Sequence, residues 1–224
     1  MTLKVVDNPA FRNRIYVFKD RMHAGELLAD ELQRHIGQGD ILLALPAGGV
    51  PVGYTVAKRL GIPLDVVIVR KIQIPWNTEA GFGAVAWDGS VVLNQVLVNE
   101  LGLTSDQIEE SVSRTRQIVS ERTQKFRGDR PLPNLRNQVI LLVDDGLASG
   151  YTMAAAVDSI GKQGTQKVIV AVPTGSSEAV QFVSSKADLV VCLNIRSRPM
   201  FAVADAYKEW YDLSDEEVIR YLRL

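Results

Sequence analysis

The chain has 224 residues, 46% of them hydrophobic and 23% charged, a composition typical of a globular protein with one sizeable core. Its 25 Lys and Arg residues balance its 26 Asp and Glu residues, so no overall field draws in nucleic acid or an anionic membrane. The single cysteine cannot form an internal disulfide, and no apolar run reaches the length of a membrane span. These features predict a cytoplasmic protein without a nucleic-acid or membrane partner, in which any anion site is local.

The predicted elements begin with an amphipathic helix over residues 20–37, because Leu27, Leu28 and Leu32 recur on one side and Gly37 ends the pattern. Five short apolar runs then predict strands, at residues 41–45, 65–69, 139–143, 168–172 and 189–193. These runs are nearly continuous in apolar character, which indicates strands buried on both faces. Because helical patterns separate several of them, we expect an α/β fold with a doubly wound, mainly parallel sheet flanked by helices.

Two capping boxes predict further helices. Thr104 and Gln107 stand at the reciprocal positions of such a box, ahead of a helical pattern that runs to residue 126. Ser214 and Glu217 repeat the arrangement near the C-terminus. The length and the absence of a linker-like stretch favour one domain over residues 1–224.

Charged and small residues follow three of the predicted strands. "PAGG" (46–49) follows the first, Arg70 and Lys71 follow the second, and Asp144 and Asp145 follow the third, ahead of "GLASGYT". Ligands of parallel sheets sit beyond the carboxyl ends of the strands, so we expect these three loops to open on one edge.

Each loop has a physical use for a ligand that carries phosphates and hydroxyls. Small residues from Gly146 to Gly150 lead into a predicted helix, where backbone N–H groups can close around a phosphate. The two ionised aspartates accept hydrogen bonds only, so they could hold a vicinal diol or the water on a metal ion. The adjacent glycines of "PAGG" permit a close backbone approach, and Arg70 with Lys71 would offset phosphate charge.

Structural explanations compete with this interpretation. The two aspartates could be a turn start and a helix cap, a glycine-rich turn between a strand and a helix is often only structural, and the Arg-Lys pair could be a solvated edge. Response regulators also carry paired acids after a strand, but near the N-terminus and without a phosphate loop. The Walker A pattern is absent, because Tyr151 stands where its lysine would be needed.

The stretch "VILLVDDGLASGYT" resembles the phosphoribosyl pyrophosphate (PRPP) motif of type I phosphoribosyltransferases: apolar residues, two acids and a small Ser/Thr/Gly loop. Further stretches are similar to an uncharacterised bacterial and archaeal branch of that family. They are "FKDRMHAGELLADEL", "LPAGGVPVGYTVAKRLG", "DVVIVRKI", "GFGAV" and "MFAVADAYKEWYDLSDEEV". The resemblance therefore covers nearly the whole chain from Phe18 onward.

The resemblance implies a role for each loop. Asp144 and Asp145 would hold the ribose hydroxyls, directly or through water on Mg²⁺, the implied cofactor, and they would act in catalysis together with Lys71. The 5′-phosphate would lie against Leu147, Ala148, Ser149, Gly150, Tyr151 and Thr152. The pyrophosphate would meet Pro46, Ala47, Gly48, Gly49, Arg70 and Lys71, with a cis peptide expected between Pro46 and Ala47. Residues 73–88 would form the family's mobile loop.

Two departures from the family pattern bear on the acceptor and the pyrophosphate. Some purine-salvage members carry Asp at the position of Ala148, where it acts on the base, and Ala148 cannot do this. Relatives of this branch are expected to carry Arg at the position of Ala47. Without that arginine, the loop at 46–49 is expected to bind pyrophosphate more weakly, or Lys71 takes over the role.

The acceptor site is implied to lie in a hood over a core of about residues 38–193. The hood would combine the N-terminal helix, residues 104–127 and residues 194–224, and Phe201 is the first candidate to stack on an acceptor, although its ring could equally belong to the core of the hood. We expect a Mg²⁺-dependent enzyme that transfers the phosphoribosyl group of PRPP to an unidentified base or related small molecule. The alternative is a PRPP-binding regulator with little catalysis, and a homodimer is left open.

Overall fold

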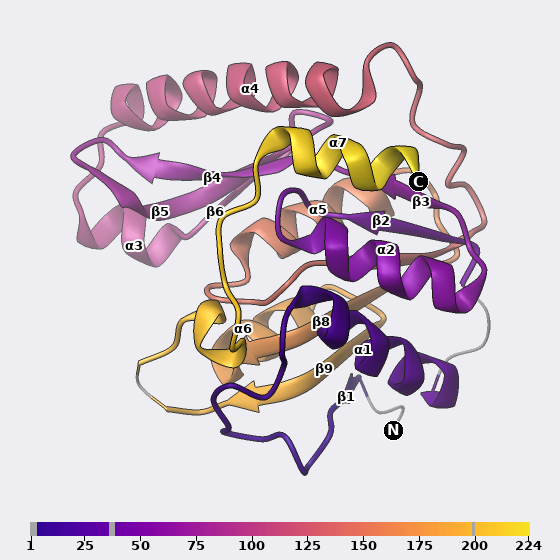
Figure 1. Cartoon of the computed structure of the whole chain (residues 1–224). Coiled ribbons are helices and arrows are strands. Elements are labelled where there is room, and N and C mark those ends of the chain that lie inside the picture. The colour runs from indigo at the N-terminus through magenta and orange to yellow at the C-terminus, as the bar shows by residue number, and fades with distance from the viewer. Residues whose placement is uncertain (1–3, 36–38, 199) are drawn as a thin grey trace.

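Six parallel strands form the main sheet of the structure, a computed structural model that describes residues 4–35, 39–198 and 200–224 (Figure 1). Their spatial order is β1-β9-β8-β7-β2-β3, and every neighbouring pair is parallel. The strands are β1 (Val5–Val6), β2 (Ile41–Ala44), β3 (Leu64–Val66), β7 (Val139–Val143), β8 (Lys167–Ser176) and β9 (Leu189–Arg196). Four of the predicted strands are confirmed and the one at 65–69 is confirmed only in part, and β1 is an addition that pairs with β9 at one edge.

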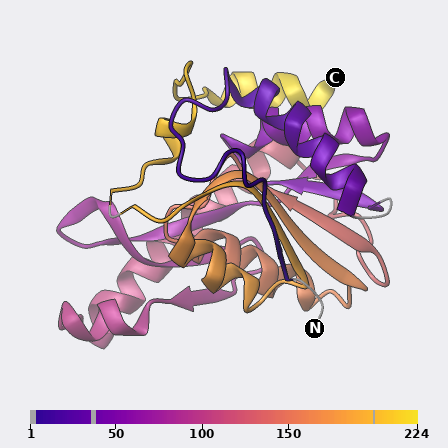
Figure 2. The same ribbon diagram turned by 90° about the horizontal axis from the view of Figure 1, so that it is seen from below.

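Helices cover both faces of this sheet, as the near-continuous apolar strands predict. α1 (Arg21–His35) and α2 (Gly49–Leu60) cover one face, and α5 (Tyr151–Gly161) and α6 (Ser177–Ser184) cover the other (Figure 2). Successive strand residues alternate between the two layers: Leu42 and Ala44 are buried on the α1–α2 side, and Leu43 is buried on the α5–α6 side. The doubly wound α/β prediction is therefore confirmed.

A second, antiparallel sheet stands beside the first and was not predicted. It consists of β4 (Val69–Ile74), β5 (Asn77–Ala86) and β6 (Val91–Leu93), followed by α3 (Gln95–Glu100). α4 (Ser105–Arg127) packs on its outer face, and α5 lies between the two sheets. The predicted strand at 65–69 is thus wrong in its second half, because β3 ends at Val66. The expected loop at 73–88 is largely a strand.

The remaining elements agree with the capping signals. Both capping boxes are present, at Thr104 ahead of α4 and at Ser214 ahead of α7 (Asp215–Arg223). A short 3₁₀ helix, η1 (Val203–Ala206), follows β9, and residues 207–214 connect it to α7 (Figure 1). The expected end of the first helix at Gly37 lies outside the described residues. No helix among the residues described is long and apolar enough to cross a membrane.

Candidate functional site

The two aspartates and the glycine loop meet because β2 and β7 are parallel neighbours. Ala44 pairs with Val143, so the residues that follow each strand emerge side by side. The peptide between Pro46 and Ala47 is cis, as the resemblance implies. A Cβ atom on Gly48 would overlap the Asp145 carboxylate. One on Gly49 would lie 2.7 Å from the carbonyl oxygen of Val143. Both glycines are therefore needed for the loop to lie against the acid pair.

Asp145 is held by two residues from distant parts of the chain. Its Oδ2 accepts a hydrogen bond from Nε of Arg21 at 2.9 Å, in an ion pair whose side chains are 8% (Arg21) and 13% (Asp145) exposed. Its carbonyl oxygen accepts a hydrogen bond from the Tyr207 hydroxyl at 2.6 Å. Oδ1 of Asp144 accepts a hydrogen bond from the Asp145 backbone N–H at 2.8 Å. The acid pair is thus fixed from α1, from its own backbone and from the C-terminal segment.

Arg21 is itself clamped by the C-terminal segment. Its guanidinium lies 3.8 Å from the centre of the Trp210 ring, and its NH1 donates to the carbonyl oxygen of Tyr211 at 2.9 Å. The Trp210 ring in turn packs on Tyr207, 5.2 Å between centroids. Sequence reasoning missed Arg21 and Tyr207. The only signal was that both fall in stretches that resemble the family, "FKDRMHAGELLADEL" and "MFAVADAYKEWYDLSDEEV".

Burial sets the electrostatics of the pair. Removal from water raises the pKa of Asp144 well above its ordinary range, and the adjacent Asp145 charge raises it further. Burial also raises the pKa of Asp145, but the Arg21 guanidinium opposes that rise. Asp144 is therefore the carboxylate whose charge is less well compensated by the protein. A cation bound from outside would favour its ionised form.

The turn after the acids presents an uncapped helix N-terminus. Gly150, with φ of 81°, is the N-cap of α5 and no side chain caps it. The turn is fastened to β8, because Leu147 exchanges backbone hydrogen bonds with Thr174 and Ser176 at 2.9 and 3.0 Å. The Ser176 hydroxyl donates to the carbonyl oxygen of Ala148 at 2.9 Å. With its carbonyls engaged, the turn leaves the first N–H groups of α5 for an anion.

A cavity of about 390 Å³ opens between this turn and the second sheet. From the turn and α5 it is lined by Asp144, Gly146, Leu147, Ala148, Ser149, Gly150, Tyr151, Thr152 and Met153. Lys71, Ala80, Gly81 and Gly83 line it from β4 and β5, and Val203 lines it from η1. The structure thus brings one cation, one carboxylate and the helix N-terminus to a single hollow of the size that small ligands occupy.

Other residues singled out from the sequence lie around this cavity without lining it. Residues 46–49 sit behind the acid pair. Arg70 lines a separate, smaller pocket toward α4. Phe201 is half-buried, and its ring centre is 5.2 Å from the guanidinium of Arg196. Gly146, which does line the cavity, has a packing reason to be glycine, because a Cβ there would lie 2.6 Å from a methyl group of Val203.

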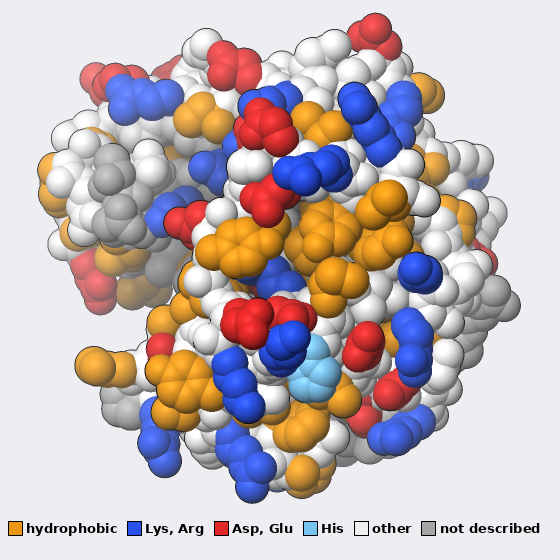
Figure 3. Space-filling model, viewed as in Figure 1, with side chains coloured by type: hydrophobic (Ala, Val, Ile, Leu, Met, Phe, Trp, Pro, Cys, Tyr) orange, Lys and Arg blue, Asp and Glu red, His pale blue; other side chains and the backbone are white. Residues whose placement is uncertain are grey.

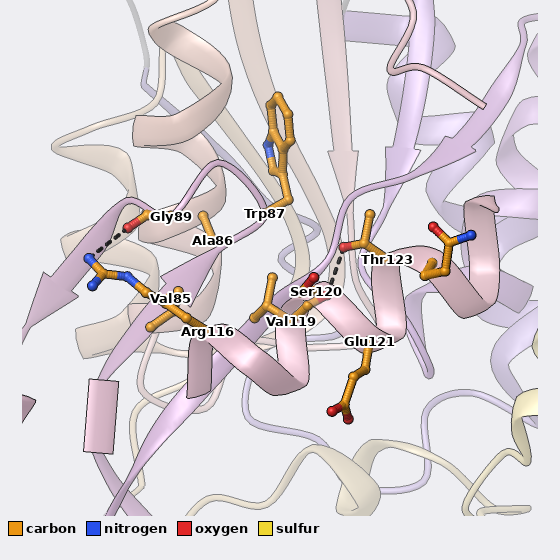
Figure 4. A pocket seen from close by; sticks show the side chains of 10 residues that line it. Val85, Ala86, Trp87, Gly89, Arg116, Val119, Ser120, Glu121 and Thr123 are labelled. Atoms are coloured by element: carbon orange, nitrogen blue, oxygen red, sulfur yellow. Dashed lines mark hydrogen bonds between the residues drawn. The ribbon is translucent and has the colours of Figure 1, made fainter. Parts of the chain in front are cut away.

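A larger cavity, of about 700 Å³, lies elsewhere, between α4 and the turn from β5 to β6 (Figure 4). Trp87 stands away from α4, and Arg116 reaches across to donate to the carbonyl oxygen of Gly89 at 3.4 Å (Figure 4). Arg116 is the one cation among the described lining residues, and no helix N-terminus opens there. This cavity lacks the phosphate chemistry of the smaller one.

Residues 87–208, just over half of the chain, match the family model described as the phosphoribosyl transferase domain. The chain belongs to the phosphoribosyltransferase family. The match includes the acid pair and the turn after it, whereas Arg21, residues 46–49 and Lys71 precede it.

Two relatives extend the likeness over most of the chain. The protein TT1426 from Thermus thermophilus, whose crystal structure is known, is 37% identical in sequence to this chain. The two structures superpose with a TM-score of 0.75, and the match covers 92% of this chain and 97% of TT1426. A Mycobacterium tuberculosis H37Rv protein named "Putative phosphoribosyl transferase Rv0571c" is 39% identical over 207 residues, 92% of this chain. The chain spans 46%, about half, of that curated relative.

Proposed function

We propose that the chain binds PRPP in the 390 Å³ cavity and transfers its 5-phosphoribosyl group to a small-molecule acceptor, with release of pyrophosphate. The observation that carries the proposal is the meeting of the uncapped α5 N-terminus, Asp144 and Lys71 in one hollow. A phosphate, a diol and a second anionic group are the features of PRPP that these three elements match.

The 5′-phosphate is bound by the turn from Leu147 to Thr152, where backbone N–H groups and the hydroxyls of Ser149 and Thr152 donate to it. The ribose hydroxyls are held by Asp144 and Asp145, and Lys71 binds the pyrophosphate. Residues 46–49 do not line the cavity, and they support the acid pair from behind. Arg70 is not included, because it lines the pocket on the other side of β4.

The carboxylates fit Mg²⁺. They supply hard oxygen ligands, and the described residues contain no cluster of three or more acidic, His or Cys side chains that would form an all-protein cage. Mg²⁺ ordinarily binds through one or two carboxylates together with substrate phosphates and water, and the two adjacent aspartates suit that role. The ion, when bound, stabilises the charge on the departing pyrophosphate.

The chain's own contribution to the reaction is electrostatic and positional. As the bond between C1 of the ribose and the pyrophosphate oxygen breaks, positive charge develops on the sugar, and the nucleophile forms a new bond at C1. The carboxylates beside the ring favour that charge, and Lys71 stabilises the negative leaving group. Binding at both ends of the donor holds C1 in place for the incoming atom.

The acceptor is a nucleobase or a related molecule in this proposal, and Phe201 is the candidate to stack on it. Ala148 has no carboxylate that could accept a proton from the nucleobase. An acceptor that must lose a proton therefore needs another residue as the general base, or binds already deprotonated. Val203 lines the cavity from the same segment as Phe201, which supports an acceptor position at that end.

The test is a screen for pyrophosphate release from PRPP and Mg²⁺ in the presence of bases and small amines. Turnover with one acceptor class, lost in Lys71→Ala, supports the enzyme. Binding of PRPP without turnover on any acceptor would contradict transfer and leave a PRPP-responsive binding protein instead.

A further inference from the structure

The pocket on the outer face of β4 carries an unused cation. Arg70 projects from β4 toward α4, the opposite side from the 390 Å³ cavity, and lines a small pocket of about 90 Å³. It forms no hydrogen bond or ion pair with any residue that the structure describes. Its pKa is lowered, first by burial and then by the nearby Arg122 guanidinium, with Asp215 opposing the change. The Arg70 guanidinium thus lies near a second cation, and Asp215, which is paired with Arg122 and Lys125, offsets these charges only in part.

The groups around Arg70 supply further donors. Arg114 lines the pocket from α4 and uses one guanidinium nitrogen on Glu110 at 2.8 Å, which leaves other N–H groups available. Ser111 lines it as well, and its hydroxyl makes no hydrogen bond to a described residue. The Thr115 hydroxyl is taken, because it donates to the carbonyl oxygen of Ser111 at 2.7 Å.

The pocket shares Lys71 with the proposed PRPP cavity. The two hollows therefore adjoin at the Lys71 side chain. In Figure 3, basic side chains are visible in the shaded hollow below α4, between the second sheet and the C-terminal helix.

We propose that this pocket is a second anion site, distinct from the PRPP cavity, which takes one inorganic phosphate between Arg70, Arg114 and Ser111. Guanidinium groups bind phosphate with two parallel hydrogen bonds, and two of them from different elements face the same space here. The volume excludes a nucleotide, since small-molecule sites usually begin at roughly 300 Å³. The inference stands on these side chains alone and does not depend on whether PRPP is the ligand of the first cavity.

Phosphate titrations of the full chain by calorimetry test the proposal. Phosphate could also bind at the turn before α5. The test is therefore made in the Ser149→Asp variant, in which a carboxylate in that turn repels phosphate. Phosphate still binds to this variant, and adding Arg70→Gln with Arg114→Gln weakens the remaining binding at least tenfold. Arg116→Gln is the matched control on α4, because Arg116 lines a different cavity, and it leaves the phosphate affinity unchanged.

Two results would overturn the second site. One is the disappearance of all phosphate binding in Ser149→Asp. The other is remaining binding that changes less than twofold in Arg70→Gln with Arg114→Gln. Thermal melts check that each variant is folded. Substitution of Arg114 is not expected to destabilise the fold, because its side chain is 67% exposed. If Arg70→Gln alone lowers stability, Arg114→Gln alone carries the test.

Discussion

Arg21 and Asp145 are 124 residues apart in sequence and form a nearly buried ion pair, 2.9 Å between Nε and Oδ2. The pair joins the first turn of α1 to the loop after β7. The C-terminal segment completes it, because Trp210 covers the guanidinium and the Tyr211 carbonyl accepts from it. Three distant segments of the chain therefore meet on one carboxylate of the proposed donor site.

Breaking this pair is expected to destabilise the fold. Arg21→Met keeps much of the side-chain volume but leaves a buried carboxylate without its cation, a change that typically costs about 3 to 5 kcal/mol. Urea unfolding measures it. Arg34→Met is the control on the same helix, since Arg34 is 68% exposed in its pair with Glu31 and is expected to cost about 0–1 kcal/mol. Equal losses for the two variants would contradict the role given to Arg21, and Asp145→Asn should relieve part of the Arg21→Met loss.

Asp144→Asn is expected to stabilise the free protein while weakening the binding of PRPP with Mg²⁺. A buried carboxylate with raised pKa is costly to ionise, so the neutral amide should raise the free energy of unfolding by about 1–3 kcal/mol. Denaturant titrations at neutral pH compare the two proteins. A destabilised Asp144→Asn would contradict the electrostatics described for the pair.

The same carboxyl predicts a pH dependence. The native state holds the Asp144 proton above the ordinary aspartate pKa of about 3.9, so above that pH the native protein binds more protons than the unfolded chain. The contribution of Asp144 to stability is therefore present at low pH and is lost as pH rises toward the folded pKa. The difference in unfolding free energy between Asp144→Asn and the original chain should grow across that window and then level off. If the difference in unfolding free energy between the two proteins shrinks as pH rises, the pKa of Asp144 is not raised in the folded protein.

Gly48→Ala is expected to weaken PRPP binding by tenfold or more, because the added methyl group overlaps the Asp145 carboxylate. Calorimetry with PRPP and Mg²⁺ provides the affinity. Gly161→Ala is the matched control, since a Cβ there meets nothing within 4 Å. If both variants bind PRPP equally well, the loop at 46–49 does not support the acid pair as described.

Gly146→Ala should disturb the C-terminal segment through Val203, whose methyl group lies 2.6 Å from the added Cβ. We expect a loss of about 1–3 kcal/mol from overpacking, with partial recovery when Val203→Ala is added. A double-mutant cycle by thermal unfolding measures the coupling. If the stability losses of Gly146→Ala and Val203→Ala are additive, the added methyl group does not press on Val203.

The elements with local signals could be predicted from the sequence, and those that depend on distant partners could not. The strand at 139–143 and both capping boxes were found because apolar runs and cap residues specify them locally. The second sheet was missed because the apolar run at 65–69 continues through the point where the chain leaves the first sheet. Nothing in the run marks that turn.

The site divides in the same way. The acid pair and the phosphate turn are contiguous in sequence, and the structure brings Asp144, the turn and Lys71 together. Arg21 could not be found, because a helical pattern does not say which polar residue faces a carboxylate 124 positions away. Arg70 and Lys71 are adjacent in sequence, yet Lys71 lines both the 390 Å³ cavity and the small pocket toward α4, whereas Arg70 lines only the small pocket of these two. Their different surroundings emerged only from the fold.

The central claim is that Asp144 and Asp145 form a donor site for PRPP with Mg²⁺. Thermal unfolding with PRPP at about 100 times its dissociation constant tests it, since such occupancy adds about 2.7 kcal/mol and raises the Tm by roughly 5–10 °C in a chain of this size. We expect that rise with PRPP and Mg²⁺, and its absence in Asp144→Asn with Asp145→Asn. An unchanged Tm in saturating PRPP, or an equal rise in the double variant, would contradict the account.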